Sequence, residues 1–291
     1  MKKQMYFIAI CLLPLFLSAQ TGEPQLWGKC SLEDFQKPPY SEWYAKNYAD
    51  YEPNPDLTAQ LKNENWKDYT VTVFLGTWCG DSRREVPRFI KVLDAVGFPR
   101  DAITLIAISA DDSVYKQSPG REERDRHIYR APTFILSKKG VEVNRIVEIP
   151  VVSLERDLLS ILRNRYTPNY ASYIYLSQWL DEGALNDKNI SHRGMARQIK
   201  HLTQSVGELN SLGMVLSRSG EKELEAAIHV FRINAYLYPE AWQPQKSLAE
   251  SLYLRGDTEE ARRAIQKALE LNKDVQNVKS LLEIEAKIIA R

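Results

Sequence analysis

The sequence contains few cysteines and few histidines. Among its 291 residues are three cysteines and four histidines. So few thiols exclude a scaffold held together by disulfides. The histidines do not stand at the spacing of a metal site, so we predict neither a metal nor another cofactor. They are His127, His192, His201 and His229.

The chain also has no excess charge of one sign and no long apolar run in its interior. Its 39 Lys and Arg residues against 38 Asp and Glu give a net charge of +1. This balance gives no reason to expect a nucleic-acid partner or a charged membrane surface. The composition, 44% hydrophobic and 26% charged, is that of a globular protein long enough for two domains.

The first 19 residues have the layout of a secretory signal peptide. Lys2 and Lys3 precede an apolar stretch from Tyr6 to Leu17, which is too short to span a bilayer, and the small residues Ser18 and Ala19 follow. We predict cleavage after Ala19, export to the bacterial periplasm or cell envelope, and no membrane span in the mature chain. Cleavage removes Cys11 and two of the 39 basic residues, which leaves two thiols and a net charge of about −1.

One of these thiols, Cys79, stands where a strand is expected to meet a helix. The apolar run Val71 to Leu75 predicts a buried strand, and apolar residues recur at helical spacing after the cysteine until Gly97. The N-terminus of a helix stabilises an anion, and Arg83 and Arg84 add positive charge. We therefore expect the nucleophilic thiolate to be favoured over the thiol.

Two motifs around this cysteine resemble the thioredoxin superfamily, particularly its extracytoplasmic thiol-disulfide oxidoreductase branch. Trp78-Cys79-x-x-Ser82, followed by Arg83-x-Glu85-x-Pro87, is similar to the Trp-Cys-x-x-Cys active-site turn. The segment Arg130 to Leu136 resembles the one that carries a cis-proline facing the cysteine, with Pro132 in that place. A hairpin at 137–140, a strand at 141–149 and a helix at 152–163 then follow in the family's order.

The resemblance implies an α/β thioredoxin-like fold over residues 56–165, with a central mixed sheet flanked by helices. Cys79 would be the nucleophile, and Pro132 with Ala131 and Thr133 would align the substrate backbone. Trp78 would shape the turn, while Gly80 and Asp81 would set the geometry of the helix cap. Substrates would be exported proteins or peptides that contain disulfides.

The second cysteine of the motif is absent, which limits what the site can do. Ser82 cannot be oxidised, so a Cys-x-x-Ser site forms a mixed disulfide and waits for an outside thiol, although Ser82 could hydrogen-bond the thiolate. Thioredoxins proper also bury an acid where this chain has Val73. Glu85 takes the place of a glutamate of the extracytoplasmic branch and is the candidate acid–base group; the alternative is a solvated helix residue.

Cys30 is the other mature thiol, and two interpretations of it stay open. It lies in the arm of residues 20–55, which is rich in Pro, Tyr and Trp and is expected to dock on the domain through a helix near residues 41–50. Cys30 could resolve the mixed disulfide in place of Ser82. Otherwise it is a free or buried small apolar side chain.

Residues 166–291 show only helical patterning and form a second predicted domain. Ala227 and Ala261, like Phe231 and Ile265, stand 34 residues apart, a period that resembles tetratricopeptide repeats. Such repeats stack into an all-α array with a concave face that can bind a peptide. The alternative is a helical cap that only stabilises its neighbour.

The sequence thus supports two hypotheses of function. The first is an exported monothiol oxidoreductase or isomerase acting through Cys79. The second is a non-catalytic binding module, in which a degenerate thioredoxin fold and the helical repeats hold a partner. Loss of the resolving cysteine favours the second hypothesis, whereas retention of Trp78, Cys79 and Pro132 favours the first.

Overall fold

The computed structural model describes residues 24–187 and 189–290, which form a mixed five-stranded sheet and eleven α-helices. The predicted signal peptide, including Cys11, lies outside the described residues. None of the helices built from the described residues has the length and hydrophobicity to span a bilayer.

The sheet has the strand order β1-β3-β2-β4-β5. Central β2 runs parallel to β3 and antiparallel to β4, and the two edge strands pair antiparallel with their neighbours. The carboxyl ends of β2 and β3 therefore meet at one edge of the sheet. The strands are β1 (Gly28–Cys30), β2 (Tyr69–Leu75), β3 (Ile103–Ala107), β4 (Thr133–Lys138) and β5 (Val141–Val147).

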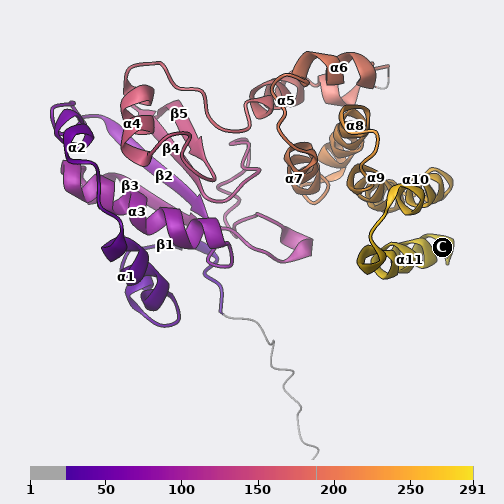
Figure 1. The fold of residues 1–291 in the computed structure, drawn as a ribbon, viewed down its shortest axis with the longest axis horizontal. Coiled ribbons are helices and arrows are strands. Elements are labelled where there is room, and N and C mark those ends of the chain that lie inside the picture. The colour runs from indigo at the N-terminus through magenta and orange to yellow at the C-terminus, as the bar shows by residue number, and fades with distance from the viewer. Residues whose placement is uncertain (1–23, 188, 291) are drawn as a thin grey trace, which may run out of the picture.

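Four helices share one core over one face of this sheet (Figure 1). Their apolar stripes pack on alternate residues of the strands, such as Val71, Val73 and Leu75 of β2. This is the larger of the two cores on the sheet. The helices are α1 (Tyr40–Asp50), α2 (Pro55–Lys62), α3 (Gly80–Val96) and α4 (Leu154–Leu162).

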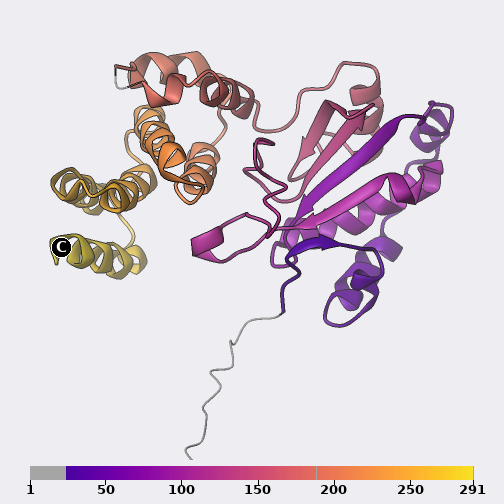
Figure 2. The same cartoon turned by 180° about the vertical axis from the view of Figure 1, so that it is seen from behind.

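The opposite face of the sheet carries a smaller core. Phe74 and Ile106 project to this side and pack with Ile128, Ala131 and other residues that flank or follow the strands. The loop between β3 and β4 contributes part of this smaller core. Within the loop, the 3-10 helix η3 (Asp112–Val114) and several turns are formed. Figure 2 views the molecule from this side, where the strands are seen directly.

Helices α5 to α11 follow the sheet and lie to one side of it, beyond the loop between β3 and β4 (Figures 1 and 2). They have a core of their own, into which Tyr129 of that loop inserts. The helices are α5 (Ser172–Asp181), α6 (His192–Ile199), α7 (Val206–Leu216), α8 (Glu221–Leu237), α9 (Gln243–Arg255), α10 (Thr258–Leu271) and α11 (Val275–Ile289).

The residues that stand 34 positions apart in the sequence are buried at equivalent places in two helices. Ala227 and Phe231 of α8, and Ala261 and Ile265 of α10, are at most 1% exposed. The small side chains of Ala227 and Ala261 let neighbouring helices approach closely, and Phe231 and Ile265 fill the space between the helices. The helical, strand-free character predicted for this part of the chain is confirmed over its described residues.

Two details of the first part differ from the sequence expectation. The arm contributes strand β1 to the sheet, whereas the sequence analysis expected it only to dock through a helix. Helix α2 ends at Lys62, although the helical pattern of the sequence extends from Leu57 to Trp66. The side chain of Asn65 forms a turn by accepting the N–H of Lys67, and the Trp66 ring packs on Phe98 instead.

Candidate functional site

Cys79 lies at the junction between β2 and α3, as the sequence predicted. It is the N-cap residue of α3, and its carbonyl accepts the N–H of Arg83 at 3.0 Å. Its side chain makes no capping hydrogen bond. The half-buried sulfur therefore stands beside the unpaired N–H groups that begin the helix, an environment that stabilises an anion.

The cysteine faces the segment that leads into β4. Its Sγ donates a hydrogen bond to the carbonyl of Ala131, 3.1 Å away and 52 positions later in the chain. The peptide bond between Ala131 and Pro132 is cis, as predicted. Thr133 follows as a buried residue, and its Oγ1 donates to the carbonyl of Arg130 at 2.8 Å. The structure thus brings Cys79 and this predicted segment together.

Ser82 is buried, and its hydroxyl hydrogen-bonds the backbone of the turn rather than the sulfur of Cys79. Its Oγ accepts the N–H of Gly76 at 3.1 Å, and no hydrogen bond to Cys79 is present among the described residues. The expected contact with the thiolate is therefore not formed in this state. Trp78 is also fixed, because its indole N–H donates to the carbonyl of Ile108 at 2.9 Å.

The other predicted turn residues flank the cysteine without touching its sulfur. Asp81 accepts a hydrogen bond from Arg84 at 2.6 Å, so its carboxylate is paired rather than directed at the thiol. Gly80 begins α3, and a β-carbon there would meet no atom within 4 Å. Gly76, by contrast, leaves space for the Trp78 ring, a role that the sequence analysis missed.

Glu85 is buried, which contradicts the solvated alternative. Its side chain is 5% exposed and accepts hydrogen bonds from Arg84 at 2.6 Å and from Arg88 at 3.4 Å. No hydrogen bond joins it to the sulfur among the described residues, so an acid–base role would need an intervening group.

Cys30 and Cys79 are both free thiols, and the structure does not bring them together. Cys30 lies in β1, where it pairs with Leu105 of β3, and it packs on the core shared with α1 to α4. Cys79 packs on the smaller core of the opposite face. A disulfide needs Cα atoms within about 7 Å, and the sheet separates these two. This arrangement favours the interpretation of Cys30 as a free, buried side chain over that of a resolving thiol.

A cavity of about 370 Å³ lies over Cys79, and the helical part of the chain forms one of its walls. Helix α7 supplies Gly207, Asn210, Ser211 and Met214 to that wall. The remaining lining residues come from the cysteine turn and from the loop and strand segments around it: Trp78, Cys79, Tyr115, Lys116, Arg130, Ala131 and Glu148. Nothing in the sequence indicated that the helical part of the chain would reach this site.

Arg130 connects the two parts of the chain at the cavity. It pairs with Glu148 at 3.0 Å, and it also donates to the hydroxyl of Tyr173 and to the carbonyl of Gly207, at 3.2 and 3.1 Å. Together these contacts engage every nitrogen of its guanidinium. Arg130 stood in the motif that the sequence analysis quoted, but nothing in the sequence indicated its partners.

Lys116 is the second charged group that the sequence analysis missed. It is 4% exposed, and its Nζ donates to the carbonyl of Tyr129 at 2.7 Å and to Oγ of Ser211 at 3.0 Å. Burial lowers the pKa of the Lys116 ammonium from 10.5 to about 7, and the nearby charge of Arg130 acts in the same direction. A lone lysine in an irregular stretch carries no sequence signal of this environment.

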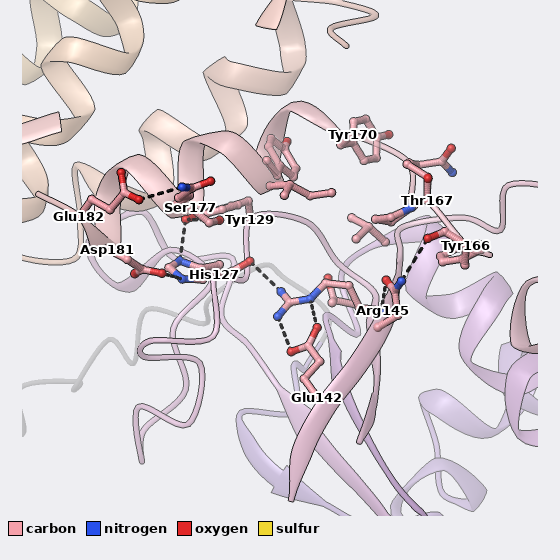
Figure 3. Close-up of a pocket in the computed structure, with 18 residues that line it drawn as sticks. His127, Tyr129, Glu142, Arg145, Tyr166, Thr167, Tyr170, Ser177, Asp181 and Glu182 are labelled. Atoms are coloured by element: carbon pink, nitrogen blue, oxygen red, sulfur yellow. Dashed lines mark hydrogen bonds and ion pairs between the residues drawn. The ribbon is translucent and has the colours of Figure 1, made fainter. Parts of the chain in front are cut away.

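A second cavity, of about 520 Å³, lies on the other side of the segment that carries Pro132. Figure 3 shows it between β5, the segment at 166–170 that leads to α5, and α5 itself. Its walls include the rings of Tyr129, Tyr166, Tyr170 and Tyr173. The cavity is therefore bounded by both parts of the chain, like the cavity at Cys79.

The polar groups around this second cavity are paired with one another (Figure 3). Arg145 donates to Glu142 at 2.6 Å and to backbone carbonyls of the loop before β4. His127 contacts Asp181 at 3.1 Å, and Gln178 donates to Glu182 at 2.7 Å. This pairing ties the loop and β5 to α5, and leaves mainly tyrosine rings as the surface of the cavity.

No group of three or more His, Cys, Asp or Glu side chains that could hold a metal ion occurs within residues 24–187 and 189–290. No protein-family model matches this chain, and no curated protein matches it at a significant level.

Proposed function

We propose that this chain is an exported monothiol thiol-disulfide oxidoreductase or isomerase, built on a thioredoxin-like fold at residues 56–165. One observation carries the proposal: the thiol of Cys79, at the start of α3, donates to the carbonyl of Ala131, directly before cis-Pro132. Both predicted motifs thus meet at one sulfur. The mixed sheet, with Cys79 after its central strand, supports the thioredoxin-like fold.

The chemistry at this site is one exchange step. The Cys79 thiolate attacks one sulfur of a substrate disulfide, the S–S bond breaks, and the other sulfur leaves as a thiolate that takes a proton from water. Ser82 and Cys30 cannot complete a second step, because one is a hydroxyl and the other lies on the opposite face. A free thiol from solution must then attack the mixed disulfide and regenerate Cys79.

Helices α5 to α11 would form the tetratricopeptide-like domain of residues 166–291. The contacts of Arg130 with Gly207 and of Lys116 with Ser211 favour a helical part that is fixed against the cysteine site. This supports the capping role over an independent peptide-binding array.

The second candidate is a non-catalytic binding module. The commitment of Ser82 to the backbone N–H of Gly76 favours it, since the site then has a single sulfur and no internal means of release. In that case Cys79 would have a structural role, and partners would bind without forming a covalent bond to it.

Trapping of mixed disulfides tests the proposal. The purified chain is incubated with disulfide-containing exported proteins and, separately, with a small disulfide; the reactions are quenched in acid and analysed by non-reducing electrophoresis and intact mass. We expect adducts at Cys79 that reduction removes. Cys79→Ser should abolish them, Cys30→Ser should leave them unchanged, and Ser82→Cys should convert trapping into turnover.

Absence of any reducible adduct, in a chain whose Cys79 still reacts with an alkylating reagent, would rule out the oxidoreductase. Recovery of partners with Cys79→Ser as efficiently as with the unaltered chain would then support the binding module.

A further inference from the structure

The amine of Lys116 is buried at the cavity that Cys79 also lines, and it has no acidic hydrogen-bond partner among the described residues. Its two hydrogen-bond acceptors, the carbonyl of Tyr129 and Oγ of Ser211, are neutral. No carboxylate forms an ion pair with it in the part of the chain that the structure describes. Burying a cation without a counter-ion is costly, so this placement calls for an explanation.

Two groups at the cavity act on Lys116 with negative charge, Glu148 and Cys79, and only one of them has no charged partner. Glu148 is already paired with Arg130, and the residues that α7 contributes are all uncharged. Tyr115 presents its ring to the Lys116 ammonium at 4.8 Å, but burial raises the pKa of its phenol, which keeps it neutral. Among the residues lining the cavity, this leaves the sulfur of Cys79.

The backbone also fixes Lys116 in this place. Its φ of 55° lies in the left-handed region, which residues other than glycine seldom adopt. The conformation is held because the N–H of Lys116 donates to the carbonyl of Ser109, while the N–H of Ser109 donates to Gln117. Such conformations persist only where surrounding contacts enforce them, and they gather at functional sites.

We propose that Lys116 is the positioning residue for Cys79, forming a thiolate–ammonium pair across the cavity, and that Ser211 of α7 holds its amine in place. The inference rests on the proposed function and deepens it. When Lys116 is neutral, the S–H proton of Cys79 is lost to solvent and the amine takes up one from solvent, which leaves S⁻ and NH₃⁺ without a net gain or loss of protons. When Lys116 is already charged, its ammonium stabilises the thiolate that forms by proton loss to water.

Two further observations support the pair. The charge of Glu148 and, to a smaller extent, the presence of Cys79 raise the pKa of Lys116 against the larger effects of burial and of Arg130, and the resulting value of about 7 lets the amine exchange protons at neutral pH. Ser211 accepts from Lys116 and in turn donates to the carbonyl of Tyr129 at 2.9 Å. The helical part of the chain is thereby joined to the reactive centre through one hydroxyl.

The rate of Cys79 alkylation as a function of pH tests this inference. Iodoacetamide labelling at Cys79 is followed by peptide mass analysis in the full chain and in Lys116→Met, Lys116→Arg and Ser211→Ala. We expect Lys116→Met to shift the midpoint of the profile upward by about one pH unit, which is about a tenfold lower rate below the midpoint. Lys116→Arg keeps the charge and should restore most of the rate, and Ser211→Ala should give a smaller shift.

Lys139→Met is the matched control, because that lysine is 74% exposed and distant from the cavity. Superimposable profiles for Lys116→Met and the unaltered chain would overturn the inference. If Lys116→Met does not fold, as judged by circular dichroism, Ser211→Ala decides the question, and an unshifted profile counts against the pair. A lysine-dependent profile without mixed-disulfide formation would refute the proposed function while leaving the pair intact.

Discussion

The ring of Trp78 lies so close to Gly76 that a β-carbon on Gly76 would come within 2.5 Å of Trp78 Cε2. The ring cannot easily move, because its N–H donates to Ile108 at 2.9 Å. We expect Gly76→Ala to lower the free energy of unfolding by about 1–3 kcal/mol through overpacking. Gly80→Ala is the control, since it meets nothing within 4 Å and removes a helix glycine, which should stabilise by about 0.5 kcal/mol.

Urea unfolding of both variants measures these changes. Equal effects of the two substitutions would show that the Trp78 contact does not constrain Gly76. The same variants report on the site, because a displaced Trp78 ring alters one wall of the cavity over Cys79.

The two thiols are expected to differ sharply in reactivity. Burial, helped by the charge of Asp34, raises the pKa of the Cys30 thiol to about 12, so its nucleophilic thiolate is scarce at neutral pH. We predict that iodoacetamide labels Cys79 in the native chain, and labels Cys30 only after denaturation. Peptide mass analysis with and without urea checks this. Labelling of native Cys30 as fast as Cys79 would contradict the burial argument.

The sequence predicted the elements around Cys79 well, because their signals are local. The apolar run of β2, the helical periodicity of α3 and the glycine at position 97 each act within a few residues. The glycine ends α3 with a φ of 73°, a conformation that suits it. The cis bond at Pro132 was predicted through a motif rather than a local preference.

The rest of the site depends on contacts between distant segments. Lys116 and Ser211 are 95 residues apart, and Arg130 and Gly207 are 77 apart. No periodicity indicates that α7 will lie against the loop before β4. The sequence left two interpretations open for Cys30 and for Glu85 for the same reason, since both depend on which face of the sheet or helix a side chain occupies.

We expect Arg130 to hold the helical part of the chain against the sheet. Its side chain is 18% exposed and pairs with Glu148, which is 16% exposed, while its other nitrogens reach Tyr173 and Gly207. We expect Arg130→Met to lower the free energy of unfolding by about 2 kcal/mol or more, because Glu148 loses its counter-ion. It should also speed proteolysis in the segment between α4 and α5.

Arg145→Met provides the comparison for this prediction. Arg145 is equally exposed, at 18%, but its own contacts, with Glu142 of the same strand and with the carbonyls of Arg126 and His127 in the loop before β4, do not reach the helices. This variant should lose stability without faster cleavage between α4 and α5. If both variants are cleaved at the same rate, Arg130 does not join the two parts of the chain.

The stacked pair of His192 and His229 should make the helical part sensitive to acid. Their ring nitrogens are 2.7 Å apart, and burial with mutual repulsion lowers the pKa of His192 from 6.5 to about 4. Burial and the charge of Arg232 lower the pKa of His229 as well. Because the unfolded chain binds these protons first, stability should fall as the pH drops from about 6.5 towards 4.

His192→Gln removes one proton-binding group and the repulsion on its neighbour, so the loss of stability between about pH 7 and pH 5 should become smaller. Urea midpoints at the two pH values, read from the helical signal in circular dichroism, give the measurement. His201→Gln is the matched control, because His201 is exposed and lies outside the pair. An acid-induced loss in His192→Gln as large as in the unaltered chain would show that the histidine pair is not its source.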